Sequence, residues 1–372
     1  MAVTYVPYKA KKLLNTYKHI DGGWFWNKYS AYPYIGCQFG CEFCYAREPK
    51  YLPYPDPDDF DRNIKVKLNA PELLRKELAK VPVDLISTGD YQPTEKEFKL
   101  SRHLLEVALE MGFPVLILER SPLLTRDLDL IAAINKRAFA TVLFSTSFAD
   151  SQAAKRIFEP KSPAVKLRFK AMEKIASQDI LTGTAFMPIL PLIADSEANL
   201  EAVVKMTRDS GGSFVLAGGL TLSGYQKDRY LNLVSKHYPE LTPKYDDLYK
   251  SSYGPSGTYW LQIASKVREL CHKYGIKDRM PRRIPQGRLA TNKRIAEKLF
   301  LKVYDLELAM ESNYKIWAFR KAAWAVDELD RGIEEIYTAQ GIEGLLAIPN
   351  IGKQLGGEIE TILKGRQNEH LG

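Results

Sequence analysis

Short apolar runs alternate with amphipathic stretches over the first 220 residues. Five runs are rich in Val, Ile, Leu and Phe and are bounded by Gly, Pro or polar residues, which is typical of buried strands. These runs span residues 83–88, 113–119, 140–147, 180–190 and 213–220. Amphipathic stretches predict helices over residues 70–80, 95–112, 162–178 and 195–211, the last with Asp195 and Ser196 as an N-cap pair.

This alternation predicts an α/β fold in which helices cover a parallel sheet, with its chemistry at the carboxyl ends of the strands. The pattern stops after residue 220. Residues 221–290 are rich in Tyr and basic residues, which indicates a capping region and a basic linker. From residue 291 onward the pattern is purely helical. We therefore expect a barrel domain over 1–220, the cap and linker over 221–290, and a small all-α domain over 291–372.

Length and charge narrow the classes of protein. A chain of 372 residues fits two domains. The N-terminus lacks the apolar core of a signal peptide, and no stretch is apolar over the roughly 18 residues of a membrane span, so we expect a cytoplasmic protein without membrane contact. Residues 291–372 carry 11 basic and 13 acidic side chains, whereas the whole chain has a net charge of +8. Residues 1–290 therefore hold the basic excess, which permits a polyanionic partner.

Three of the four cysteines lie in "GCQFGCEFC", residues 36–44. Cys37, Cys41 and Cys44 have the spacing C-x3-C-x2-C, and so tight a cluster indicates metal or redox chemistry. Three thiolates can hold three corners of a four-iron cluster and leave one iron open to a substrate. Two other interpretations stay open, a zinc site and chance. Zinc would need a fourth ligand, and no His or further Cys is close in sequence.

An aromatic residue, Phe43, precedes the last cysteine, and the pattern C-x3-C-x-Φ-C resembles the signature of radical S-adenosylmethionine (SAM) enzymes. "CYAREPKY", "DRNIKVKLNAPELLRKEL", "STGDYQPTEK" and "FEPKSPAVKLRFKAM" resemble the branch related to spore photoproduct lyase, often called DNA repair photolyases. The resemblance covers about residues 24–275. It implies a partial (β/α)6 barrel, a [4Fe-4S] cluster whose open iron chelates SAM, and an electron donor such as flavodoxin or ferredoxin. The cofactors would then yield a 5′-deoxyadenosyl radical that abstracts a substrate hydrogen.

The resemblance also implies residues that bind SAM. Phe43 would lie by the adenine, and Thr88, Gly89 and Asp90 would bind the amino group. Ser145 and Ser147 would contact the methionyl or ribose part, and Glu159 and Arg168 would fix the ribose and carboxylate. For each serine, a hydroxyl that only satisfies a strand end is an equal alternative.

One position departs from spore photoproduct lyase, in which a cysteine on the second strand donates a hydrogen atom. Here Ser87 stands at that position, ahead of Thr88-Gly89-Asp90, and a serine O–H is a much poorer hydrogen-atom donor. Lyase chemistry by the same route is therefore in question. Tyr91 is a candidate radical relay, although we favour a packing role. The fourth cysteine, Cys271, is expected in the core of an amphipathic helix that ends at Gly275.

Residues 345–363, "LLAIPNIGKQLGGEIETIL", have the form of a helix-hairpin-helix. Together with "NYKIWAFRKAAWAVDEL", they make residues 291–372 resemble the N-terminal domain of family-X DNA polymerases. The hairpin would bind a DNA phosphate through Asn350, Ile351, Gly352 and Lys353. Glu358 stands where some of those polymerases have a Schiff-base lysine, so we expect binding without lyase activity. An ordinary helical turn and a protein-interaction bundle are the alternatives.

These features favour a radical SAM enzyme that acts on DNA and repairs a photolesion such as a thymine dimer. A flipped-out lesion would enter the barrel. The basic residues Arg279, Arg282, Arg283 and Arg288 would extend the DNA footprint or form a solvated charge run. Radical modification of RNA or a protein is one alternative. A non-catalytic, cluster-containing protein that binds nucleic acid is another.

Overall fold

The computed structural model describes residues 3–54, 56–150, 152–250 and 252–369. The chain divides into two compact units, and we describe each by itself. The barrel unit comprises Met1–Tyr17 and Asn27–Met280, and the helical unit comprises Lys18–Trp26 and Pro281–Gly372. None of the described helices has the length and apolar character that a membrane span requires.

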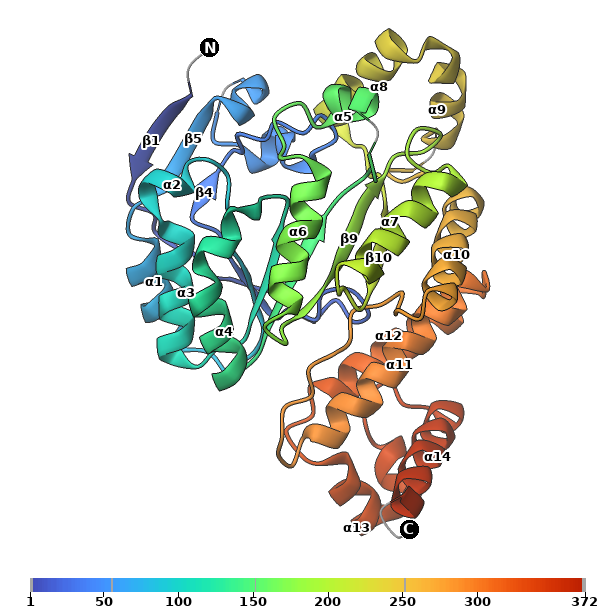
Figure 1. Cartoon of the computed structure of the whole chain (residues 1–372). Coiled ribbons are helices and arrows are strands. Elements are labelled where there is room, and N and C mark those ends of the chain that lie inside the picture. The colour runs from blue at the N-terminus through green and yellow to red at the C-terminus, as the bar shows by residue number, and fades with distance from the viewer. Residues whose placement is uncertain (1–2, 55, 151, 251, 370–372) are drawn as a thin grey trace. The chain divides into compact units, whose positions relative to one another are not determined.

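A seven-stranded sheet forms the centre of the barrel unit, in the order β10-β9-β8-β7-β6-β3-β2 (Figure 1). Its six parallel strands are β3 (Tyr29–Ala31), β6 (Ile86–Thr88), β7 (Val115–Glu119), β8 (Ala140–Ser145), β9 (Leu181–Ile189) and β10 (Val215–Gly219). The short β2 (Asn15–Thr16) pairs antiparallel with β3. The five strands predicted from apolar runs are thus confirmed, because a parallel strand that is covered on both faces carries a nearly continuous apolar run.

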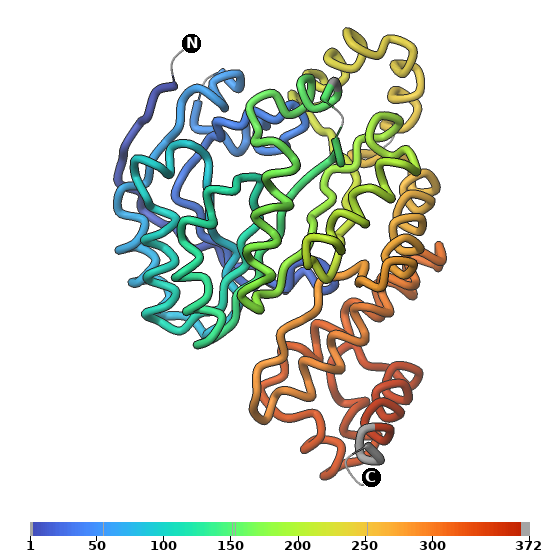
Figure 2. Tube along the Cα trace, in the orientation of Figure 1, coloured from blue at the N-terminus to red at the C-terminus, as the bar shows by residue number. Residues whose placement is uncertain are grey.

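Helices alternate with these strands along the chain, whose course can be followed in Figure 2 by its colour, from blue at the N-terminus toward yellow. They are α1 (Ala70–Leu78), α2 (Glu95–Phe98), α3 (Leu100–Met111), α4 (Leu128–Arg137), α5 (Gln152–Phe158), α6 (Val165–Ala176), α7 (Glu197–Asp209), α8 (Gly224–His237), α9 (Thr242–Leu248) and α10 (Gly257–Lys273). Apolar residues of α3, α4 and α6 pack on β7 and β8, and those of α7 and α10 pack on β9 and β10. Cys271 lies in this second cluster and is buried.

Two of the predicted helices differ in detail. The helix predicted over 95–112 is interrupted at Lys99, which has a φ of +53°. The Glu95 carboxylate accepts hydrogen bonds from the backbone N–H groups of Ser101 (2.9 Å) and Arg102 (3.3 Å), so it satisfies the first turn of α3. At α7, the Ser196 hydroxyl caps the Asn199 N–H at 3.3 Å, whereas Asp195 instead accepts from the Leu192 N–H.

A second, three-stranded sheet has the order β1-β5-β4, with β1 (Thr4–Tyr8), β5 (Asn63–Lys67) and β4 (Tyr34–Ile35). Strand β4 leads directly into the cysteine segment, and its partner β5 follows that segment in the chain. This small sheet therefore fixes both ends of the segment that carries the three cysteines.

The helical unit contains α11 (Ala290–Leu308), α12 (Asn313–Asp327), α13 (Ile333–Leu346) and α14 (Lys353–Glu369). Segment 18–26 also belongs to this unit, although the sequence analysis placed it in the barrel domain. Its aromatic residues explain the difference: His19 stacks on Trp324 at 4.5 Å, and Trp26 packs edge-on against Phe300 at 5.7 Å. The Trp324 indole N–H also donates to the Ile20 carbonyl at 2.9 Å.

Candidate active site at the carboxyl edge of the barrel sheet

The three cysteines lie on a loop that the surrounding backbone holds firmly. Gly36 has a φ of +85°, and a Cβ there would lie 2.7 Å from the Phe60 carbonyl oxygen, so glycine is required. The Cys37 N–H donates to the same carbonyl at 2.9 Å. Arg47 is buried and donates to the carbonyl oxygens of Cys41 (3.1 Å) and Gly40 (3.0 Å). Sequence reasoning missed Arg47, which fixes the loop through these two hydrogen bonds.

The thiols lie in a poorly solvated environment. Burial, followed by the nearby Asp90 and the other two thiols, raises the pKa of Cys37 well above its usual range. Burial also raises the pKa of Cys44 to about 11. These thiols are thus protonated at neutral pH, and the binding of a metal centre would release their protons.

The donor set fits a cluster better than a single ion. Among the described residues, no group of three or more His, Cys, Asp or Glu side chains converges tightly enough to hold one metal ion. A four-iron cluster does not need that convergence, because each thiolate binds a different iron. Three cysteines on one fixed loop satisfy that requirement.

Two carboxyl groups lie near the cysteine loop at the ends of adjacent strands. Asp90 follows β6, and Glu119 is the last residue of β7. Burial and the charge of Glu119 raise the pKa of Asp90 well above its usual range, and burial raises the pKa of Glu119 to about 7. Gln92 links Asp90 to the loop, since its amide donates to the Asp90 carboxylate (3.1 Å) and to the Gly36 carbonyl (3.0 Å).

Neither carboxyl group forms an ion pair with another described residue, although Glu119 accepts from the backbone N–H groups of Tyr91 and Arg120. A half-buried carboxylate, Asp90, beside a buried one, Glu119, is costly when neither has an ion-pair partner, and a cationic ligand would lower that cost. The site therefore has the electrostatic character that a ligand with an ammonium or sulfonium group requires. Thr88 and Gly89 have backbone roles at this site. The Thr88 hydroxyl donates a hydrogen bond to the Ala31 carbonyl, and Gly89 adopts a φ of +94°.

A buried network joins the ends of β7, β8 and β9. Glu159 is fully buried and pairs with Arg120 at 2.6 Å and with Arg168. Burial alone would raise the pKa of Glu159, but the two guanidinium groups outweigh it and hold the pKa at about 2. Arg168 also donates to the Ser145 carbonyl at 2.8 Å, and the Ser145 hydroxyl donates to the Met187 carbonyl at 2.9 Å. These contacts stabilise the strand ends.

Two further predicted residues border this network. The Ser147 hydroxyl is buried and has no hydrogen-bond partner among the described residues, so it remains available to a ligand. Phe43 is buried, and the Arg120 guanidinium lies over its ring at 5.1 Å. Arg120 thus connects the cysteine loop to Glu159. Arg120 could have been predicted as a site residue from the sequence, because it directly follows a predicted strand.

Ser87 and Tyr91 lie in different environments. The Ser87 hydroxyl is hydrogen-bonded to the Tyr32 hydroxyl at 2.7 Å, which is a partner that the sequence did not indicate. Tyr91 is fully buried in the core beneath the outer helices, and its hydroxyl donates to Asp127 at 3.1 Å. The placement of Tyr91 supports the packing role rather than a relay.

The predicted hairpin residues lie in the helical unit, between α13 and α14. Asn350 has a φ of +65°, Ile351 is buried, and Gly352 and Lys353 are exposed. A Cβ added at Gly352 would meet no atom within 4 Å. A kink at Gly341 divides α13, so that only its last turn leads into the hairpin.

Two of the four linker arginines, for which a DNA footprint and a solvated charge run were the two interpretations, have buried side chains. Arg282 is buried and pairs with the buried Asp327. Arg279 is also buried, and Arg288 donates to the Asp330 carbonyl at 2.8 Å. Buried guanidinium groups cannot contact a phosphate, so the footprint interpretation is wrong for Arg279 and Arg282.

No protein-family model matches this chain. A solved structure of spore photoproduct lyase, its C140A mutant with dinucleoside spore photoproduct, has a TM-score of 0.53 at 14% identity and covers 74% of this chain and 81% of that chain. The C140A mutant alone has a TM-score of 0.54 over the same shares. The likeness shows the fold: this chain shares the α/β fold of spore photoproduct lyase, with six parallel strands and outer helices.

Curated relatives by sequence are uncharacterized proteins. One from Mycobacterium tuberculosis is 27% identical over 254 residues, which is 66% of this chain and 74% of that protein. One from Methanocaldococcus jannaschii is 31% identical over 195 residues, which is 52% of this chain and 70% of that protein. This chain belongs to the family of the M. jannaschii protein.

Proposed function

We propose that this protein is a radical SAM enzyme that binds a [4Fe-4S] cluster through Cys37, Cys41 and Cys44. The observation that carries the proposal is the position of these thiols, on a fixed loop beside the half-buried Asp90 and the buried Glu119, two carboxyl groups without an ion-pair partner among the described residues at the carboxyl edge of the sheet. Ligand sites of open parallel sheets lie at this edge. When bound, the cluster and SAM would supply a carbon-centred radical that removes a hydrogen atom from the substrate.

The residues at this edge would orient SAM. Asp90, with Glu119 behind it, would attract the ammonium group, and Ser147 would donate or accept one hydrogen bond. The network of Arg120, Glu159 and Arg168 would hold the strand ends and the Phe43 ring in place. A flavodoxin or ferredoxin is the proposed class of electron donor.

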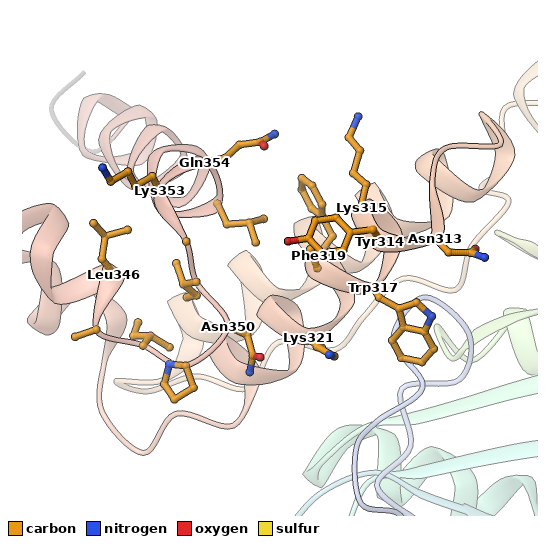
Figure 3. A pocket seen from close by; sticks show the side chains of 17 residues that line it. Asn313, Tyr314, Lys315, Trp317, Phe319, Lys321, Leu346, Asn350, Lys353 and Gln354 are labelled. Atoms are coloured by element: carbon orange, nitrogen blue, oxygen red, sulfur yellow. The ribbon is translucent and has the colours of Figure 1, made fainter.

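We further propose that the substrate is DNA and that the reaction repairs a photolesion such as a thymine dimer. The fold of spore photoproduct lyase supports this choice, as does the hairpin over residues 350–353 (Figure 3), which is exposed except at Ile351. The hairpin of residues 291–372 would bind backbone phosphates without reading bases. Gly352 has no side chain, and the space beside it is open, so a phosphate could approach the backbone there.

The test is an anaerobic incubation of reconstituted protein with SAM and dithionite. Formation of 5′-deoxyadenosine is measured by mass spectrometry with intact DNA, UV-irradiated DNA or no DNA. We expect the product to rise with irradiated DNA and thymine dimers to disappear. Cys41→Ala should abolish the product while DNA binding and the fold persist. A reconstituted cluster without any 5′-deoxyadenosine would contradict the enzyme assignment.

Ser87 supports a second candidate, radical modification of RNA or a protein. A serine hydroxyl bonded to Tyr32 replaces the thiol hydrogen-atom donor of the lyase-type route. If 5′-deoxyadenosine forms but irradiated DNA does not increase it, this second candidate is favoured over DNA repair.

A further inference from the structure

The link between α5 and α6, green in Figure 1, lies against the cysteine loop. The Glu42 backbone N–H donates to the Phe158 carbonyl at 3.0 Å, and the Ser162 hydroxyl lies 3.5 Å from the Cys41 sulfur. Ser162 is buried, but Lys161, directly before it in the chain, is exposed. The residue next to the Cys41 contact is therefore already at the surface of the barrel unit.

The surface that continues from this link onto α6 is basic. Three lysines are exposed there: Lys161, Lys166 and Lys170. No acidic residue occurs between positions 160 and 172, and the one acidic residue of α6, Glu173, stands in its last turn beside the exposed Lys174. Lys161 pairs with Asp61, whereas Lys166 and Lys170 have no acidic partner among the described residues. This surface attracts a negatively charged partner.

An apolar side chain is exposed among these lysines. Leu167 is 41% exposed, follows Lys166 directly and stands three positions before Lys170, so it shares the outer side of α6 with them. The opposite side of α6 is buried in the core of the barrel unit. A phosphate backbone offers a leucine no apolar contact, whereas protein interfaces combine an apolar centre with a polar rim. This surface therefore fits an acidic protein better than it fits a nucleic acid.

The chemistry proposed for the barrel unit requires such a partner. A cluster held by Cys37, Cys41 and Cys44 must receive its electron from outside the chain, and the rate of electron transfer falls steeply with distance. A carrier protein must therefore dock close to the cysteine loop. The link at Ser162 brings the basic surface and the Cys41 sulfur together.

We propose that Lys161, Lys166, Leu167 and Lys170 form the docking surface for an acidic one-electron carrier protein of the flavodoxin or ferredoxin class. The inference rests on the proposed function and locates the surface that its electron donor uses. In each encounter one electron leaves the carrier and passes to the cluster, and no covalent bond forms or breaks. The lysines speed the encounter by attraction of opposite charges, and Leu167 adds an apolar contact.

The experiment compares two reductants on the full-length, reconstituted protein with SAM and irradiated DNA. One is dithionite, a small ion that needs no docking surface, and the other is a reduced flavodoxin or ferredoxin at graded concentrations. Lys166→Glu with Lys170→Glu should lower the rate of 5′-deoxyadenosine formation per unit of carrier at least about tenfold, because electrostatic steering raises association rates by about 10- to 1000-fold. The rate at saturating dithionite should not change. The difference between wild type and variant should shrink at high salt.

Binding is measured separately, without SAM or reductant, by the fluorescence anisotropy of a labelled, oxidised flavodoxin. The double lysine variant should weaken this binding and reduce its dependence on salt. Leu167→Ser should weaken the binding but leave its dependence on salt unchanged, since no charge is removed. Lys76→Glu with Lys80→Glu is the matched control, because both lysines are exposed, four positions apart and in the same unit. Circular dichroism verifies that each variant folds.

The outcomes separate this inference from the proposed function. If dithionite yields no 5′-deoxyadenosine, the enzyme assignment fails and the inference fails with it. If dithionite supports the reaction but neither carrier does, or if the double lysine variant behaves like the control, only the inference fails. Loss of affinity for duplex DNA with an unchanged carrier rate would show that this surface binds DNA and would overturn the inference.

Discussion

Glu159 shows how one buried carboxylate holds the carboxyl edge of the sheet. Its two guanidinium partners keep its pKa at about 2, whereas an unfolded Glu has a value near 4.5. A lowered pKa contributes stability above about pH 4.5 that is lost as pH falls toward 2, by about 3 kcal/mol in total. We therefore expect the free energy of unfolding of the barrel unit to fall by about 2 kcal/mol from this group between pH 6 and pH 3.

Glu159→Gln isolates that contribution. At pH 7 the variant should unfold with a free energy about 3–5 kcal/mol lower, because Arg120 and Arg168 become buried, uncompensated charges. The difference between wild type and variant should shrink as pH is lowered. Urea denaturation at pH 7, 5 and 3 measures both effects. A constant difference across this range would show that the carboxylate is not held ionised.

For Asp90 we expect the opposite result: its replacement should weaken ligand binding without lowering the free energy of unfolding. Its raised pKa means that the ionised form costs stability in the protein without a ligand. Asp90→Asn should therefore leave the free energy of unfolding at pH 8 unchanged or raise it. The same change should weaken SAM binding about tenfold or more, because it removes the charge that faces the ammonium group. Calorimetric titration of the cluster-loaded protein tests the affinity, and undiminished binding would exclude Asp90 from the SAM site.

At the scale of elements, apolar runs were sufficient to locate five of the six parallel strands of the large sheet and most outer helices. Buried parallel strands and amphipathic helices have distinct periods, and those periods are written in the local sequence. The break at Lys99 was missed because its cause is a side chain of another turn, Glu95, which caps α3. The three metal-ligand candidates Cys37, Cys41 and Cys44 could be found from the sequence, because they lie close together in it. Arg120 and Tyr32, by contrast, contact the site through residues that are distant in sequence, such as Glu159 and Ser87, which lie 39 and 55 positions away.

In the linker before α11, the role of Arg282 was misinterpreted from the sequence because its partner is distant in the chain. Arg282 pairs with Asp327, 45 positions away, and Lys293 joins them at 3.1 Å. We expect Arg282→Leu to lower the free energy of unfolding of the helical unit by about 3–5 kcal/mol, since it leaves a buried carboxylate with one partner. Arg331→Leu, an exposed arginine in the same unit, should change it by less than about 0.5 kcal/mol. Equal effects of the two changes would contradict a structural role for Arg282.

At the scale of the whole molecule, the chain enters the helical unit twice. Segment 18–26 leaves the barrel unit, packs with α11 and α12, and returns to the barrel at Asn27. Gly22 approaches the Phe300 ring so closely that an added Cβ would lie 2.2 Å from it. No boundary drawn from local composition can detect this, because the segment's partners lie about 270 to 310 positions further along the chain.

This double passage predicts how truncation will behave. A protein that ends at Met280 loses the partners of His19, Ile20 and Trp26, so an aromatic segment that is packed in the full chain becomes exposed. We expect the truncated protein to bind a hydrophobic dye and to self-associate in size-exclusion chromatography. Replacing residues 18–26 by a Gly/Ser linker in the truncated protein should restore a monomer, because the apolar side chains of this segment are then removed. A truncated protein that is monomeric without this replacement would mean that segment 18–26 does not depend on the helical unit.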